Sequence, residues 1–154
     1  MSHPWTLSFV GLPAFLTYFG VAILLLLLFA FIYTRLTAHD EFALIRQGKS
    51  AASVALGGSL LAFVLPLCSA IVHSVSLVDF VIWGMIALVI QIATFFAVRI
   101  FLPNLSQRIS NNEMAAGLFV ALASIAVGAI NAACMTPCAT RHTVGRHHET
   151  LKID

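Results

Sequence analysis

The chain has 154 residues, of which 60% are hydrophobic and only 9% are charged, and its formal net charge at pH 7 is +2. A soluble protein of this size cannot cover its surface with eight basic and six acidic side chains, so a water-soluble enzyme and a secreted domain are excluded. The small net charge also excludes a nucleic-acid binder. The composition predicts a protein whose main partner is membrane lipid.

Four runs of sequence contain no Asp, Glu, Lys or Arg, and they cover about residues 14–34, 51–72, 80–98 and 114–136. Each run is about 20 residues long, and an α-helix of that length spans the roughly 30 Å hydrocarbon core of a bilayer. The runs are continuously apolar rather than alternating, which favours helices over a β-barrel. We therefore predict an all-α membrane protein with a four-helix transmembrane domain over residues 14–136.

The two ends of the chain differ from this domain. Segment 1–13 carries aromatic residues such as Trp5 and Phe9, which favour the membrane interface, so we expect an external N-terminal interfacial segment. Residues 137–154 form a polar C-terminal tail.

The distribution of basic residues predicts the orientation. The first and third connections are basic, whereas the N-terminal segment and the second connection carry no Lys or Arg. By the positive-inside rule the basic connections lie in the cytoplasm and both termini are periplasmic. The basic residues of the C-terminal tail favour the opposite orientation, and they are Arg141, Arg146 and Lys152.

The two halves of the chain resemble each other when they are shifted by 64 residues. The shift aligns identical residues, including Gly20 with Gly84, Arg35 with Arg99 and Ile45 with Ile109. We interpret this as two parallel-repeated helical hairpins. The second and fourth runs are rich in Ala, Gly and Ser, which let helix backbones approach closely, so we expect them at the bundle centre with the first and third runs facing lipid. The same small residues suit a homo-oligomer.

The first and third connections are expected to contain short helices at the membrane surface. Thr37 is placed to cap a helix with acidic residues in its first turn, and Gly48 is placed to end it. Pro103 opens the counterpart, in which Leu105 and Ile109 face one way. These connections either orient the spans or bind a cytoplasmic protein. The candidate docking residues are Thr37, His39, Asp40, Glu41, Arg46 and Gly48.

The polar residues inside the predicted spans are few and neutral. Gln91, Ser124 and Ser59 lie at similar depths and are interpreted as structural hydrogen-bonding groups. Asn131 lies near the level of Pro66 and is a candidate to bond the carbonyl that this proline leaves free. A passive pore or carrier for small ions or solutes, lined by Ser and Gln, is the alternative.

Soft ligands gather at the end of the fourth run. Cys134, Met135 and Cys138 carry sulfur atoms that suit Cu(I), so copper binding is a further hypothesis, although their spacing matches no established metal motif. We expect no other cofactor. The chain contains neither a Gly-rich phosphate loop nor a nucleophile elbow, and the residues around His39 do not form the zinc-protease pattern, so we expect no enzyme.

Several short motifs resemble the YjfL family of bacterial inner-membrane proteins, a domain of unknown function. They include Thr37-Ala38-His39-Asp40-Glu41, Leu44-Ile45-Arg46-Gln47-Gly48, Trp83-Gly84 and Asn131-Ala132-Ala133-Cys134-Met135-Thr136. The resemblance covers about residues 15–136 and implies four spans in a bacterial inner membrane. Members of the family are often encoded beside phage-shock-like and glutathionylspermidine-synthase-like proteins. That context implies a scaffold or accessory component in envelope stress, with a cytoplasmic stress-response protein as its partner.

Overall fold

The computed structural model describes residues 4–37 and 41–135, and all regular structure in these residues is helical. The helices are α1 (Pro4–Leu36), α2 (Glu41–Arg46), α3 (Ser50–His73), α4 (Leu77–Phe101), α5 (Leu105–Ser110) and α6 (Met114–Cys134). The four long helices are apolar enough to span a membrane, over Gly11–Leu36, Ser50–His73, Leu77–Phe101 and Met114–Cys134. The predicted all-α fold with four spans is therefore confirmed.

The bounds of the last three spans differ from the predicted runs by three residues or fewer, because the charged residues that limit each run lie close to the helix ends. Helix α1 differs more. It starts at Pro4 and continues through Pro13, so helix extends across the predicted boundary at residue 13. The tail after residue 136 lies outside the described residues.

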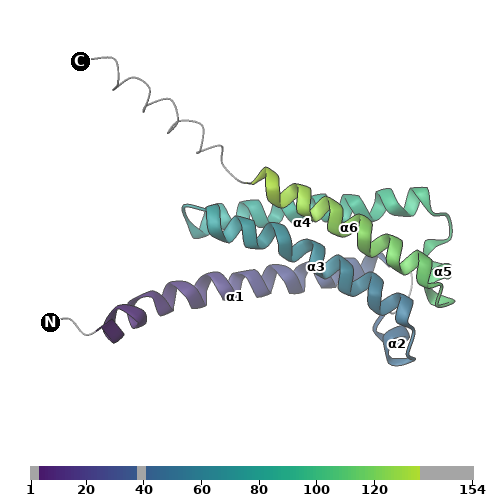
Figure 1. Cartoon of the computed structure of the whole chain (residues 1–154), viewed down its shortest axis with the longest axis horizontal. Helices are drawn as coiled ribbons and strands as arrows, with labels where there is room; N and C mark the ends of the chain where they lie inside the picture. The colour runs from purple at the N-terminus through teal and green to yellow at the C-terminus, as the bar shows by residue number, and fades with distance from the viewer. Residues whose placement is uncertain (1–3, 38–40, 136–154) are drawn as a thin grey trace, which may run out of the picture.

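The four long helices lie side by side, and the two short helices lie at one end of the bundle (Figure 1). We call this end, which contains α2 and α5, the connector end. At the opposite end, the terminal end, α1 begins, α3 turns into α4 and α6 finishes. Ser76 caps α4 at this turn, because its Oγ accepts a hydrogen bond from the Asp79 amide at 3.2 Å.

Helices α3 and α6 run in the same direction and form the closest helix pair in the bundle. Their contact is built from glycines facing alanines. A Cβ atom on Gly58 would overlap Ala121, and a Cβ atom on Gly128 would overlap the carbonyl oxygen of Ala62. We call this α3–α6 contact the glycine seam. It agrees with the expectation that the small-residue spans occupy the centre, since packing drives helix association in lipid.

Helix α4 was expected to face lipid, and this expectation is wrong for one of its faces. Residues from Phe80 to Val98 at helical spacing are buried, because α4 packs against both α3 and α6. Helix α1 is more peripheral and joins the bundle through aromatic rings. Phe29 stacks on Phe63 of α3 with ring centroids 4.7 Å apart, and Tyr33 contacts Phe95 of α4 at 5.0 Å.

The two short helices occupy equivalent positions under the 64-residue shift. Helix α2 covers Glu41–Arg46 and α5 covers Leu105–Ser110, and the helices that follow begin at Ser50 and Met114. The long helices are packed unequally, because α4 contacts both α3 and α6 whereas α1 packs on α3 and α4. The two-hairpin repeat stays a prediction.

Candidate functional site

The connector end contains most of the residues that the sequence selected as docking candidates. Both short helices there end in the same way. After α2, the amide of Gly48 donates to Ile45 O and that of Lys49 to Leu44 O, and Gly48 has φ +77°. This is a Schellman motif, in which a left-handed residue closes the helix. It confirms that Gly48 stops α2, whose last helical residue is Arg46.

Helix α5 ends in an equivalent motif with Asn112 at the left-handed position, φ 63°. The amide of Asn112 donates to Ile109 O and that of Glu113 to Arg108 O. Asparagine tolerates this conformation better than other residues with a side chain. Unlike glycine, it also supplies a side chain that can bond elsewhere.

That side chain connects the two connectors. Asn112 Oδ1 accepts from the amide of Ala51 at 3.0 Å and from the hydroxyl of Ser50 at 3.3 Å, and so caps the first turn of α3. Lys49 Nζ donates to the carbonyl oxygen of Ser110, the last residue of α5, at 2.8 Å. Cations at helix C-termini are favourable. Hydrogen bonds therefore join the two connectors, and we call this unit the connector platform (residues 41–50 and 105–113).

The outer surface of the platform is mixed apolar and polar. Phe42 of α2 is 57% exposed, and Arg46, Gln47 and Gly48 beside it are also exposed. Leu105 and Ile109 of α5 were expected to face one way, and both are buried. The other exposed residues of the platform are all polar, namely Ser50, Gln107, Asn111 and Asn112.

Two of the six predicted docking residues do not reach this surface. Thr37 was expected to cap a surface helix, but it is buried and its hydroxyl donates back to the α1 carbonyls of Tyr33 at 3.1 Å and Thr34 at 3.2 Å. Glu41 was selected as a docking residue in the first turn of its helix, but it is 1% exposed, because α2 packs against α3 with its first residue inward. His39 and Asp40 lie outside the described residues.

Glu41 belongs to a buried polar cluster that sequence reasoning missed. The Tyr33 hydroxyl lies within interaction range of Glu41 and of Ser59, and Glu41 lies within range of Thr37. None of these contacts has hydrogen-bond geometry, so the side-chain oxygens of Tyr33, Glu41 and Ser59 lack a hydrogen-bond partner among the described residues. We call these three residues the Glu41 cluster. Burial raises the pKa of Glu41 to about 8, although the nearby Thr37 hydroxyl acts in the opposite direction.

A comparison of the two halves could have revealed this cluster. The 64-residue shift aligns Glu41 with Leu105, and both are the first residue of a six-residue helix. Leu105 is 2% exposed. The burial of Glu41 was not predicted because acidic residues in the first turn are typical of a helix start that is exposed to water.

The four polar residues of the membrane interior that the sequence selected are all buried, namely Gln91, Ser124, Ser59 and Asn131. Gln91 Nε2 donates to the backbone oxygen of Ser124 at 3.3 Å, which brings these two predicted residues together, while Gln91 Oε1 lacks a partner among the described residues. Asn131 is not hydrogen-bonded to Ala62 in the described part of the chain, since its Nδ2 has no partner there. The carbonyl that Pro66 leaves free instead faces Gly128 across the glycine seam. Close Cα–H contacts to carbonyls are weakly favourable in such interfaces.

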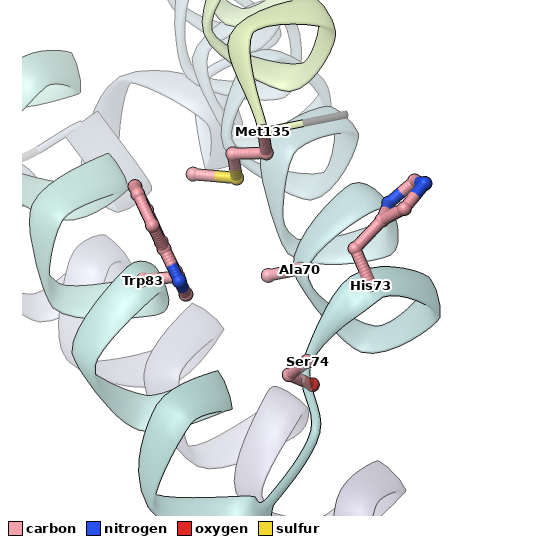
Figure 2. Close-up of a pocket in the computed structure, with 5 residues that line it drawn as sticks. All are labelled: Ala70, His73, Ser74, Trp83 and Met135. Carbon is pink, nitrogen blue, oxygen red and sulfur yellow. The ribbon is translucent and has the colours of Figure 1, made fainter. Parts of the chain in front are cut away.

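A cavity of about 150 Å³ lies at the terminal end, between α3, α4 and the end of α6. Met135 and Trp83 face each other across it, whereas the ring of His73 points away (Figure 2). The His73 ring is hydrogen-bonded through Nδ1 to Ser69 O at 2.8 Å. Cys134 is exposed, Cys138 lies outside the described residues, and no group of three metal-binding side chains occurs within residues 4–37 and 41–135.

Comparison with known proteins finds a matching family and relatives that align with most of the chain. Residues 6–135 match the family described as Domain of Unknown Function (DUF350). The chain is 46% identical to the UPF0719 inner membrane protein YjfL of Escherichia coli K12 over 126 residues, which cover 82% of this chain and 96% of that protein. It is 27% identical to the UPF0719 transmembrane protein YshE of Bacillus subtilis 168 over 135 residues, or 86% and 98% of the two chains. No solved structure matches the chain significantly.

Proposed function

Since this chain belongs to the DUF350 family, we propose that it is a non-enzymatic scaffold of the bacterial inner membrane whose connector platform binds a cytoplasmic stress-response protein. The observation that carries the proposal is the platform itself. Two connectors 61 residues apart are joined by the Lys49 and Asn112 hydrogen bonds, so they present one ordered surface.

The exposed residues of this surface suit a protein partner. Phe42 and Arg46 lie close together on α2, and aromatic residues and arginine are enriched at the energetically important centres of protein interfaces. Glu41 is buried and the Glu113 carboxylate is paired with Arg108, so among residues 41–50 and 105–113 no exposed carboxylate balances the charge of Arg46. The fitting partner is a protein with an acidic patch beside an apolar pocket.

The orientation of the chain is part of this proposal. Arg35, Arg46, Lys49, Arg99 and Arg108 all lie at or near the connector end. By the positive-inside rule this end faces the cytoplasm, which leaves both termini periplasmic. Arg35 and Arg99 are exposed near the ends of their spans and suit anionic lipid headgroups.

We also propose that the scaffold is a homo-oligomer. The glycines of the glycine seam are used within one chain, so self-association needs another face. Helix α3 offers one, with Ser53, Gly57, Leu61 and Cys68 exposed at helical spacing. If copies meet there, a membrane-permeant thiol oxidant should produce a Cys68-dependent dimer. A Cys134 dimer without a Cys68 dimer would contradict this choice of face.

Photo-crosslinking tests the docking proposal. A photo-reactive amino acid in place of Phe42 should capture one discrete soluble protein in cells, and the same group in place of Val75, which is 92% exposed at the terminal end, should not. Capture of only lipid and copies of this chain at Phe42, or the same adducts from both positions, would overturn the proposal.

The two other hypotheses have less support in the described residues. A pore through one chain would need to separate α3 from α6, whose backbones meet along the glycine seam. A copper site would need Met135, but its thioether lies in the cavity beside Trp83 while Cys134 is exposed.

A further inference from the structure

Three polar side chains from three helices are buried together near the connector end. Tyr33 of α1, Glu41 of α2 and Ser59 of α3 are each 1% exposed, and their side-chain oxygens lack hydrogen-bond partners among the described residues. Buried polar groups in native proteins are almost always bonded, so unpartnered ones point to something that the protein holds at that place. The ionisable carboxyl among them is that of Glu41, and the Tyr33 phenol lies within interaction range of both Glu41 and Ser59.

A carboxyl group is not needed to fill the buried space at residue 41. Leu105 occupies the same place at the start of α5 and is equally buried. A leucine at residue 41 would avoid the desolvation cost that a carboxylate carries in such a site. A function of the carboxyl that leucine cannot provide therefore explains its presence best.

No cation neutralises Glu41 within the described part of the chain. On α2, Arg46 is exposed; on α1, the Arg35 guanidinium lies over the Phe31 ring. Next to α3, Lys49 Nζ bonds Ser110 O. On α4, Arg99 is exposed, and Arg108 of α5 pairs with Glu113.

The described titratable group that interacts with Glu41 is the Tyr33 phenol, and the Thr37 hydroxyl is the other described side-chain group within range. The α3 hydroxyl of Ser59 interacts with Tyr33. Tyrosine is neutral near pH 7 and offers no positive charge. A proton is then the simplest species that neutralises the carboxylate, since it removes the buried charge and makes the carboxyl a hydrogen-bond donor beside the Tyr33 oxygen.

We propose that the Glu41 cluster is a proton-binding site and that loss of the proton releases α2 from the bundle. The proton passes from the Glu41 carboxyl to water, and the resulting carboxylate is stabilised only when α2 moves into the aqueous phase. The exposed face of the platform, with Phe42 and Arg46, moves with α2. This inference goes beyond the docking proposal and is tested on the purified protein alone.

The expected pH range follows from the burial of Glu41. Its pKa is about 8 when α2 is packed and 4.5 when the side chain is exposed to water. Between these values the packed form holds a proton that the released form lacks, so the ratio of packed to released α2 falls about tenfold per pH unit. Above about pH 8 both forms are deprotonated and the ratio stays constant.

Amide hydrogen exchange of the protein in lipid nanodiscs measures this ratio. Protection factors of residues 45–47, whose amides are bonded within α2 or at its end, should fall between about pH 5 and about pH 8 after correction for the intrinsic rate at each pH. Those of α5, where Leu105 replaces the carboxyl, should not change. In Glu41→Gln, which cannot lose a proton, the protection factors of α2 should be independent of pH.

Three results would overturn the proposal: a pH-independent wild type, the same fall in Glu41→Gln, or the same fall in α5. Should Glu41→Gln fail to fold, Glu41→Leu copies the residue of α5 and serves as the neutral variant. The infrared band of a protonated carboxyl should disappear in either variant, and in the wild type it should be lost as pH rises between about 5 and about 8, over the same range as the protection factors. A fall that depends on the replacement of K⁺ by Na⁺ at constant pH would assign the site to a cation and contradict the proton.

Discussion

Lys49 Nζ donates to the carbonyl oxygen of Ser110 at 2.8 Å, across 61 residues of sequence. This bond and the Asn112 cap on α3 turn two separate turns into one surface. The platform is thus held by tertiary bonds rather than by the propensity of two six-residue helices, which would not be stable alone.

Replacement of Lys49 by methionine should loosen this surface. The variant keeps most of the apolar stem but removes the donor, so the last carbonyl of α5 loses its partner and the free energy of unfolding should fall by about 1 kcal/mol. Thermal unfolding in detergent measures the change. Arg46→Met is the matched control, because Arg46 is exposed on the same connector. Equal effects of the two substitutions would show that the Lys49 bond contributes nothing.

The glycine seam should tolerate no added methyl group at its tight points. Gly128→Ala places a Cβ against the carbonyl oxygen of Ala62, and Gly58→Ala places one against Ala121, so each should destabilise the fold by about 1–3 kcal/mol. Gly57→Ala is the control, since nothing lies within 4 Å of its added Cβ. Detergent unfolding of the three variants should separate the first two from the third. A Gly57→Ala variant as unstable as Gly128→Ala would contradict the seam.

Gln91→Leu should leave membrane permeability unchanged. The amide makes one bond, to a Ser124 carbonyl, and its Oε1 has no partner in the described residues, so leucine should change stability by less than about 1 kcal/mol. Liposomes that contain wild type or variant should retain ions as well as empty liposomes do. A leak through the wild type that Gln91→Leu alters would instead favour the pore.

Global stability should depend on pH through Glu41. The native state binds a proton up to about pH 8, whereas the unfolded chain releases it near 4.5, so the unfolded state binds fewer protons in this range. Stability therefore falls as pH rises, by at most about 1.4 kcal/mol per unit. The fall should be smaller than this limit because α2 can leave the bundle without global unfolding. Denaturant unfolding of wild type and Glu41→Gln over this range measures the difference. If the free energies of unfolding of the two proteins change equally with pH, the role of Glu41 is contradicted.

The sequence predicted the spans well because their limits depend on local hydropathy. It also predicted that Gly48 stops α2 and that Leu105 and Ile109 share one face of α5, since turn chemistry and periodicity are local. It failed for Thr37 and Glu41. An acidic residue behind a threonine is typical of a solvated helix start, and only the packing of α2 against α3 turns Glu41 inward.

Contacts between residues far apart in the chain could not be predicted from the sequence either. Asn131 was selected as the partner of the Ala62 carbonyl only because the two lie at a similar depth in the membrane. Contact also requires that a residue lies on the facing side of its helix. On α6, Gly128 is the residue that faces the Ala62 carbonyl. The Lys49–Ser110 bond could not be foreseen, because it depends on the parallel packing of α3 and α6.

Thiol labelling from each side of the membrane tests the central claim most directly, which is that the connector platform faces the cytoplasm. Gln47→Cys and Val75→Cys place one exposed thiol at each end of a chain whose own cysteines are replaced by serine. With a membrane-impermeant maleimide, position 75 should react in spheroplasts and position 47 only in inverted vesicles. Labelling of position 47 from outside would contradict the account, because no cytoplasmic protein could then reach the platform.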